Sequence, residues 1–462
     1  MKAYTIFEYG HITAKPATSA VQVSQKGFRY LENLALDSTN AESGFLKLTK
    51  ISGQRAIQVR NYVGVLQLPT TEQLEILPKI AKLAPAYGDG FVGQSASSIA
   101  AFSESRSALL NMLRSLKYFR HIASAESSLA TSKLPLLDIF ISQFLASVNQ
   151  LIKRGLRSEY LSREDNVLFL KGKLLPSKQL KHNLVNKQRF YVEQDEYLND
   201  RPINRLIHTA LKKVAAYTHV NSQQKLCREL SFAFSDVPTS KNVKQDFAVV
   251  KMTRGMEYYR QPLAWAKLIL EGLSPIAMAG QAKGISLLFP MEAVFEAYVA
   301  RVLAEQLPAP YRLNEQAKGE TQHLVSFGDK NWFRLKPDLL IKQGKSTVLV
   351  MDTKWKLLDS QKNNGTDKLG LSQADFYQMF AYGHKYLQGA GDIVLIYPAT
   401  ATFSQPIESC FQFNEGAGGS NLRLWVVPFD VATPTPNVAR MMWPTALHGF
   451  SPVHGKSTLQ MA

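Results

Sequence analysis

The chain has 462 residues, which is long for one compact core and sufficient for two or three domains. Hydrophobic residues make up 45% of the chain and charged residues 20%, which excludes a disordered chain, and no stretch approaches the roughly 20 apolar residues of a membrane span. The 54 Lys and Arg residues exceed the 37 Asp and Glu residues, and the net charge of +17 favours a polyanionic partner such as nucleic acid through counterion release.

Residues 1–95 are predicted to form a β-rich domain. Short apolar runs such as AIQVRNYVGVLQL and QLEILPKI are separated by Ser, Gly and Asn clusters, as expected for strands joined by turns. Glu8, His11 and Lys15 stand where a secretory signal would keep an apolar segment, so we expect a cytoplasmic location. A polar, glycine-bearing stretch at 88–98 predicts a linker.

Residues 96–280 are predicted to be mainly helical. SALLNMLRSLKYF and PLLDIFISQFLASVNQLI carry apolar residues at i, i+3 and i+4, and Pro135 suits the start of a helix. Cys227 and Cys410 lie outside any Cys/His cluster, so a zinc site or disulfide framework is not expected. The spread of basic residues predicts a folded basic surface rather than a tail, and its members here include Lys171, Lys173, Lys178, Lys181, Lys187 and Arg189.

The last part of the chain is predicted to be an α/β domain followed by a tail. Residues 281–440 have the order helix, strands, helix, strands, which is typical of a mixed sheet flanked by helices. Residues 441–462 are assigned to a C-terminal tail. The predicted fold class is therefore multidomain α+β, with a β-rich N-terminal domain, a helical middle region and a C-terminal α/β core.

Two aspartates are predicted to meet at one end of a β-hairpin. Asp338 follows a proline, and Asp352 begins an Asp-Thr-Lys triplet. A turn near Gly344 and Lys345 would place Asp338 almost opposite Asp352, where the carboxylates could hold a hard cation such as Mg²⁺. Lys354 is two residues from Asp352, so both side chains leave the strand on the same face. The alternative is a chance hairpin with an ordinary surface ion pair.

A helix before the hairpin is predicted to add a carboxylate. PMEAVFEAYVARVL starts at Pro290 and carries Glu292 and Glu296 one turn apart. Either glutamate could reach the metal site, and we favour Glu296. Both could instead be solvated carboxylates on the helix surface.

A helix after the hairpin is predicted in LSQADFYQMFAYGHKY. Ser372 and Asp375 have the spacing of a capping box. Gln378 and Tyr382 lie at i and i+4 on one helical face, where Gln378 could contact a phosphate or the attacking water. Tyr377 and Tyr382 could serve packing alone.

Two Gly-Lys-Ser triplets do not form phosphate-binding loops. They occur at Gly344–Ser346 and Gly455–Ser457, and the motif needs a glycine five residues earlier. Leu339 and Phe450 occupy those positions. The chain is therefore not expected to be an NTPase itself.

The order E…PD…DxK…QxxxY resembles the PD-(D/E)xK nuclease superfamily, and the QxxxY helix is similar to its RecB-like branch. Further segments, including LPKI, FLKGKL, RFYVEQDEYLNDRPINRLI and VMDTKWK, resemble the McrC family, the nuclease subunits of McrBC-type modification-dependent restriction systems. The resemblance is specific over roughly 165–400 and loose over the first ninety residues.

The resemblance implies a role for each candidate residue. Asp338, Asp352 and Glu296 would bind Mg²⁺, and Mn²⁺ could replace it. Lys354 would orient or polarise the water, and Gln378 would steady the site. The family also implies cleavage of double-stranded DNA together with a hexameric AAA+ GTPase or ATPase of McrB type, onto which the N-terminal domain would dock.

Two other functions stay open from the sequence. A non-catalytic adaptor would keep a nuclease fold for DNA contact and motor activation, although the intact D…DxK set speaks against it. A standalone RecB-like nuclease would need no motor, although LPKI and DRPINRLI lie outside a nuclease core and favour a partnered subunit.

Overall fold

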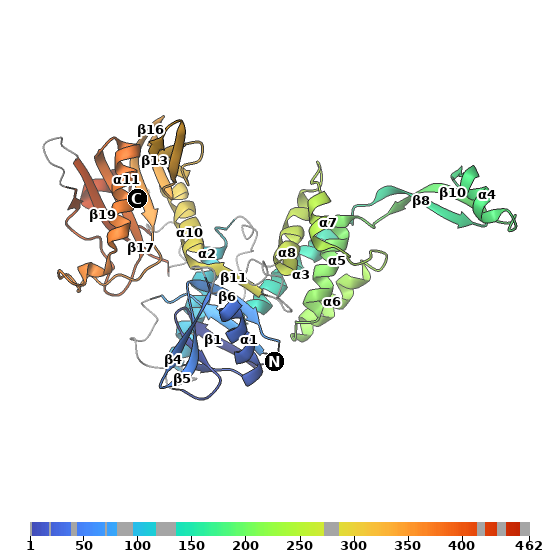
Figure 1. Cartoon of the computed structure of the whole chain (residues 1–462), viewed down its shortest axis with the longest axis horizontal. Helices are drawn as coiled ribbons and strands as arrows, with labels where there is room; N and C mark the ends of the chain where they lie inside the picture. The colour runs from blue at the N-terminus through green and yellow to red at the C-terminus, as the bar shows by residue number, and fades with distance from the viewer. Residues whose placement is uncertain are drawn as a thin grey trace, which may run out of the picture. The chain divides into compact units, whose positions relative to one another are not determined.

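The computed structural model describes residues 2–17, 20–37, 44–69, 72–80, 96–116, 135–271, 286–413, 421–431 and 440–452 (Figure 1). The chain forms two compact units, one spanning Leu134–Leu287 and the other combining Lys2–Lys133 with Leu288–Ala462. Most of the predicted linker at 88–98 and the last ten residues of the predicted tail lie outside the described residues.

Two sheets and one helix form the N-terminal region. The first sheet has the order β1 (Lys2–Phe7), β7 (Glu72–Leu77), β6 (Tyr62–Gln67) and β11 (Ser286–Pro290). The second has the order β3 (Ala20–Gln22), β2 (His11–Thr13), β5 (Gln54–Val59) and β4 (Leu46–Ile51). The strands predicted in the two apolar runs are therefore β5, β6 and β7.

Helix α1 (Gln25–Asp37) was not expected in a β-rich region. Phe28, Leu31 and Leu34 are buried, and their spacing of three residues places them on one face of a helix. The sequence therefore carries an amphipathic helical pattern here, and α1 packs against β4 and β5.

The unit Leu134–Leu287 is built mainly from helices. Helix α3 follows Pro135, and α5 has Pro202 in its first turn, the position where a missing backbone N–H costs least. The helices are α3 (Leu136–Arg154), α5 (Pro202–Ala215), α6 (Asn221–Phe232), α7 (Val243–Val249) and α8 (Arg260–Glu271), with the 3-10 turn η4 (Glu257–Tyr259).

An antiparallel arm interrupts these helices and was not foreseen. Strands β8 (Glu159–Val167) and β10 (Phe190–Leu198) pair along their full lengths, and β9 (Lys173–Leu174) and α4 (Pro176–Asn183) form its tip. Figure 1 shows the arm projecting from the helices of its own unit. The prediction of helix for this segment was wrong because the pairing of β8 with β10 joins residues far apart in the sequence.

The C-terminal region contains a mixed sheet with two packed helices. The parallel pairs are β16 with β17 and β17 with β19, and the remaining neighbours are antiparallel. The strand order is β12 (Tyr311–Glu315), β15 (Leu339–Gln343), β16 (Ser346–Thr353), β17 (Ala390–Pro398), β19 (Asn421–Phe429) and β18 (Phe411–Gln412). The other elements of the region are α10 (Met291–Gln306), the pair β13 (Gln322–Phe327) and β14 (Lys330–Leu335), α11 (Gln373–Leu387), and the turns η5 (Lys368–Gly370) and η6 (Thr445–Phe450). Helix α2 (Ala96–Leu113), from an earlier part of the chain, packs against α10.

Helix α11 covers the face of the sheet on which the candidate site lies. Its buried Met379 and Tyr382 pack in one cluster with Val350 of β16 and Leu395 of β17. Because side chains alternate along a strand, Asp352 leaves β16 on the same face as Val350. Among the described residues, no helix is both long and apolar enough to cross a membrane.

Candidate active site

The predicted hairpin is present as β15 and β16. Leu339 pairs with Met351, so the preceding Asp338 lies opposite Asp352. The register shifts by one residue near Ile341, and Gly344 takes the turn with a φ of 62°, a conformation that favours glycine. The first Gly-Lys-Ser triplet therefore forms a hairpin turn rather than a phosphate-binding loop.

Asp338 is held by the residue between Asp352 and Lys354. Its Oδ2 accepts hydrogen bonds from the backbone N–H of Thr353 at 2.8 Å and from the Thr353 hydroxyl at 2.7 Å. Two donors on one carboxylate oxygen fix the orientation of Asp338 before any ligand binds. The sequence did not single out Thr353, because its side chain contributes only through this contact across the hairpin.

Asp352 is almost fully buried, with 2% of its surface exposed. Burial, and then the negative charge of Asp338, raise its pKa to about 7, although the Lys354 ammonium opposes the shift. Lys354 Nζ lies 2.7 Å from Asp352 Oδ2. A divalent cation bound between the two facing carboxylates would offset the cost of an ionised, buried Asp352 beside Asp338.

Lys354 is held in place by three side chains. Besides its contact with Asp352, its Nζ donates to Gln378 Oε1 at 2.9 Å and lies 3.7 Å from Asp375 Oδ1. Burial alone would lower the pKa of Lys354, but the neighbouring carboxylates outweigh it and raise the pKa. Lys354 therefore stays protonated near neutral pH and provides a fixed positive charge.

The predicted QxxxY face of α11 forms a hydrogen-bond chain. Gln378 Nε2 donates to the Tyr382 hydroxyl at 2.8 Å, and that hydroxyl donates to the carbonyl of Lys336 at 3.1 Å. Tyr382 thus packs in the core and also orients Gln378. Tyr377 is 66% exposed and takes no part in this chain.

Asp375 has a different role from the one its spacing indicated. Ser372 is the residue before α11, but its side chain makes no capping hydrogen bond. Asp375 instead faces Lys354 and accepts a hydrogen bond from the Tyr397 hydroxyl at 3.3 Å. The capping-box prediction was wrong because the Lys354 ammonium attracts the Asp375 carboxylate more strongly than the backbone N–H of Ser372 does. Asp375 lies three residues before Gln378 on the same helical face, and this spacing could have indicated that Asp375 also faces the site.

The two glutamates of α10 differ in their surroundings. Glu296 accepts a hydrogen bond from Gln316 Nε2 at 2.9 Å, and burial followed by the charge of Asp338 raises its pKa. Glu292 accepts a hydrogen bond from Asn61 Nδ2 at 3.0 Å. Glu296 is therefore electrostatically coupled to Asp338, whereas Glu292 is bound to the N-terminal region.

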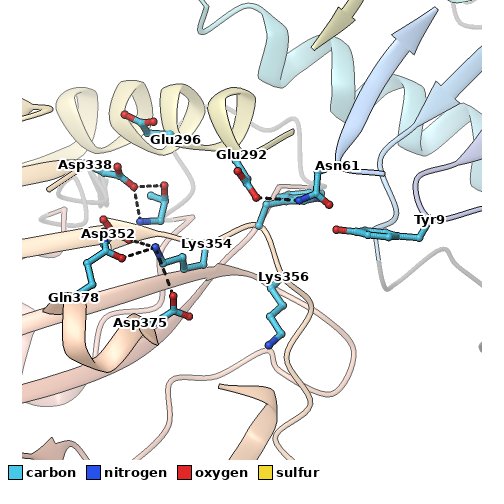
Figure 2. Close-up of a pocket in the computed structure, with 12 residues that line it drawn as sticks. Tyr9, Asn61, Glu292, Glu296, Asp338, Asp352, Lys354, Lys356, Asp375 and Gln378 are labelled. Atoms are coloured by element: carbon cyan, nitrogen blue, oxygen red, sulfur yellow. Dashed lines mark hydrogen bonds and ion pairs between the residues drawn. The ribbon is translucent and has the colours of Figure 1, made fainter. Parts of the chain in front are cut away.

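These side chains line one pocket of about 620 Å³. Figure 2 shows Asp338, Asp352 and Lys354 on one side, with Tyr9 and Asn61 of the N-terminal region on the other. Five carboxylates and two lysines give the lining a net negative charge, which suits a bound cation. The lining residues are Tyr9, Asn61, Glu292, Glu296, Asp338, Asp352, Thr353, Lys354, Trp355, Lys356, Asp375 and Gln378.

The carboxylates of the pocket suit a Mg²⁺ ion that is bound by only a few protein ligands. Within the described part of the chain, no three His, Cys, Asp or Glu side chains gather closely enough to form a metal centre. The facing carboxylates of Asp338 and Asp352 are the donors that the structure offers, and Glu296 stays a predicted third ligand. Mg²⁺ commonly binds through one or two carboxylates and completes its shell with water and substrate phosphate.

We expect Asp352→Asn to stabilise the metal-free protein at alkaline pH. Because folding raises the pKa of Asp352 from 3.8 to about 7, its ionisation destabilises the fold as the pH rises through that range. In EDTA, the melting temperature of Asp352→Asn should therefore exceed that of wild type at about pH 8 and differ much less at about pH 3, where Asp352 is largely protonated in both the folded and the unfolded wild-type chain. A lower melting temperature of Asp352→Asn at the alkaline pH would contradict the raised pKa of Asp352, which burial and then the charge of Asp338 cause.

Comparisons with known proteins give a family and a fold. A family model described as McrBC 5-methylcytosine restriction system component matches residues 57–398. A solved structure described as a half-complex of Thermococcus gammatolerans McrB AAA+ hexamers with bound McrC is similar, with a TM-score of 0.64 and 20% identity over 94% of this chain and 97% of that chain. At this identity the similarity shows a shared fold.

A second solved structure, the cryo-EM structure of the Thermococcus gammatolerans McrBC complex, has a TM-score of 0.47 and 22% identity over 66% of this chain and 88% of that chain. A search of curated protein sequences gave no match.

Proposed function

Because the chain belongs to the family of McrBC 5-methylcytosine restriction system components, we propose that it is the DNA-cleaving subunit of such a system. The proposed reaction is Mg²⁺-dependent hydrolysis of phosphodiester bonds in double-stranded DNA by a PD-(D/E)xK site. One observation carries the proposal: Asp338, Asp352 and Lys354 meet in one pocket, with Lys354 fixed by Gln378. The net charge of +17 suits a DNA substrate.

In the proposed mechanism, the residues of the pocket have different roles. Asp338 and Asp352 would hold Mg²⁺, with Glu296 next to Asp338 in support. When bound, Mg²⁺ would lower the pKa of a coordinated water and neutralise charge on the phosphate. Lys354 places a fixed positive charge where negative charge grows on the phosphate oxygens. Gln378 and Asp375 restrict the Lys354 amine to that position.

We propose a hexameric AAA+ NTPase as the partner. The solved structure with the same fold is described as McrC bound to McrB AAA+ hexamers. Recognition of modified bases would then belong to the partner. The alternatives are a non-catalytic adaptor that activates the motor and a standalone RecB-like nuclease.

The test of this function is plasmid cleavage by the wild-type chain, with Mg²⁺ or EDTA, and with or without the AAA+ partner and its nucleotide. We expect cleavage with Mg²⁺, the partner and the nucleotide together. Full cleavage by the chain alone would favour the standalone nuclease. NTPase stimulation without cleavage under any condition would favour the adaptor.

The tip of the arm is a candidate surface for the partner, in addition to the N-terminal domain. Phe169 and Val185 are 80% and 88% exposed, far more than apolar side chains that serve packing within a domain. Further exposed apolar residues at this tip are Leu168, Leu170, Leu180 and Leu184. We propose that these side chains contact the AAA+ partner.

The proposed contact between the arm and the AAA+ partner can be tested by the double substitution Phe169→Ser and Val185→Ser. We expect affinity for the AAA+ partner to fall at least about a hundredfold, because two large apolar contacts are lost, each worth roughly 1.5 kcal/mol or more. Phe232→Ser is the matched control, since Phe232 is 82% exposed on α6 of the same unit. Unchanged affinity of the double variant, measured by interferometry, would remove the arm from the docking surface.

A further inference from the structure

Glu8 is a buried carboxylate that the proposed mechanism does not use. It lies just after β1, is 2% exposed, and its backbone N–H donates to the carbonyl of Leu77 at 2.9 Å. Burial, as the largest cause, raises its pKa to about 7. An acid so deeply buried costs stability unless its hydrogen bonds compensate, so its contacts require an explanation.

The contacts of Glu8 join two segments of the sequence. Its Oε1 accepts a hydrogen bond from the backbone N–H of Lys79, in the LPKI segment, at 2.9 Å. The same oxygen accepts one from the Trp355 indole Nε1 at 2.7 Å. The second oxygen, Oε2, is buried without a hydrogen-bond partner in the described structure. Glu8 therefore links LPKI, which the nuclease mechanism leaves unexplained, to the residue that follows Lys354.

Trp355 is well placed to transmit this contact to the candidate active site. It is 7% exposed, lines the pocket, and packs on Phe295 of α10 with ring centroids 5.2 Å apart. Lys354, immediately before it, donates its backbone N–H to the carbonyl of Ile396 at 2.8 Å. The end of β16 is thus fixed by β17 on one side and by Trp355 on the other.

The turn that presents Glu8 is itself conformationally strained. Tyr9 has a φ of 64°, an uncommon conformation for an aromatic residue, and its backbone N–H donates to the carbonyl of Val59 at 3.0 Å. A Cβ on Gly10 would lie 2.5 Å from the Ile6 side chain, so the turn also requires glycine there. Strain of this kind is maintained where the geometry serves a function. Here it directs Glu8 to Trp355 while Tyr9 lines the pocket.

From these contacts we infer that Glu8 is a positioning residue for DNA cleavage: through Trp355 it fixes the end of β16 that carries Asp352 and Lys354. The inference rests on the proposed nuclease function. If Glu8 has this role, the N-terminal sheet supports the geometry of the nuclease site in addition to its proposed role in docking the partner. Displacement of that sheet by a partner would then move the catalytic side chains.

Three substitutions test the inference in the full chain with its AAA+ partner. Trp355→Phe removes the indole N–H and keeps an aromatic ring, Glu8→Leu removes the acceptor, and Glu8→Gln keeps an oxygen acceptor. The first two should lower the single-turnover cleavage rate by about ten- to a hundredfold, because small misplacements of catalytic groups have effects of this size. Glu8→Gln should stay within about threefold of wild type, and the affinity of every variant for DNA should be unchanged.

The control for general loosening of the N-terminal sheet is Thr5→Val. It removes the hydrogen bond from the Thr5 hydroxyl to Glu75 Oε2, 3.0 Å long, in the same pair of strands. Thr5 is not among the residues that line the pocket. We expect a normal cleavage rate even if its melting temperature falls.

Two kinds of result would overturn the inference. A wild-type rate in folded Trp355→Phe or Glu8→Leu would show that the contact does not position the site. Equal losses in Thr5→Val, or in Glu8→Gln, would show a structural effect only. If Glu8→Leu fails to fold, Trp355→Phe decides alone. A wild-type system that never cleaves DNA refutes the proposed function, and the positioning role falls with it, whereas normal cleavage by Trp355→Phe refutes the positioning role only.

Discussion

Asp338→Asn should lower the rate of DNA cleavage by about 10³-fold while the protein stays folded and still binds DNA. Metal coordination by the aspartates is expected to supply several kcal/mol of transition-state stabilisation, and each 1.36 kcal/mol changes a rate about tenfold. Asparagine keeps an oxygen that can accept the hydrogen bonds from Thr353, so the hairpin should persist. What is lost is the negative charge that the cation needs.

The measurement is single-turnover cleavage with Mg²⁺ and the AAA+ partner, together with Mn²⁺ affinity by calorimetry. Asp329→Asn is the matched control, because Asp329 is an exposed carboxylate in the turn between β13 and β14. Cleavage and Mn²⁺ affinity equal to those of wild type would remove Asp338 from the metal site.

Lys354→Met should lower the cleavage rate by about 10²- to 10³-fold, the usual effect of losing one group that stabilises developing charge. Whereas Asp338→Asn should weaken Mn²⁺ binding, Lys354→Met should strengthen it. The Lys354 ammonium lies 2.7 Å from Asp352 Oδ2 and competes with a cation for that carboxylate. The substitution therefore separates metal binding from catalysis.

Lys354→Arg should not restore the rate. The amine is held by Asp352, Asp375 and Gln378 together, and a planar guanidinium has a different size and donor geometry. Cleavage rates and Mn²⁺ affinities of both variants check this pattern. A parallel loss of rate and Mn²⁺ affinity in Lys354→Met would mean that the lysine organises the metal site instead of the phosphate.

The sequence predicts the parts of the site that depend on local geometry. The turn at Gly344 and the spacing of Asp338 and Asp352 determine the hairpin register within one residue, because strands joined by a short turn have few alternatives. The helical periodicity likewise placed Gln378 and Tyr382 on one face of α11. Their proposed chemical roles remain predictions.

The contacts missed by the sequence analysis are long-range. Glu8 and Trp355, or Asn61 and Glu292, meet only because the N-terminal sheets pack beside the α10 and β16 ends. No periodicity within either segment contains that information. Asp375 was misread for a related reason, since its partner Lys354 comes from another element and displaced a plausible local one.

The most direct measurement compares wild type with Asp352→Ala in Mg²⁺, each with and without the AAA+ partner and its nucleotide, using a supercoiled plasmid. We predict cleavage only by the wild-type chain with its partner, because Asp352 and Asp338 form the facing pair at the end of the hairpin. Equal cleavage by both proteins would contradict this and place the nuclease site elsewhere. No cleavage by either, with NTPase stimulation retained, would leave the adaptor as the function of the chain.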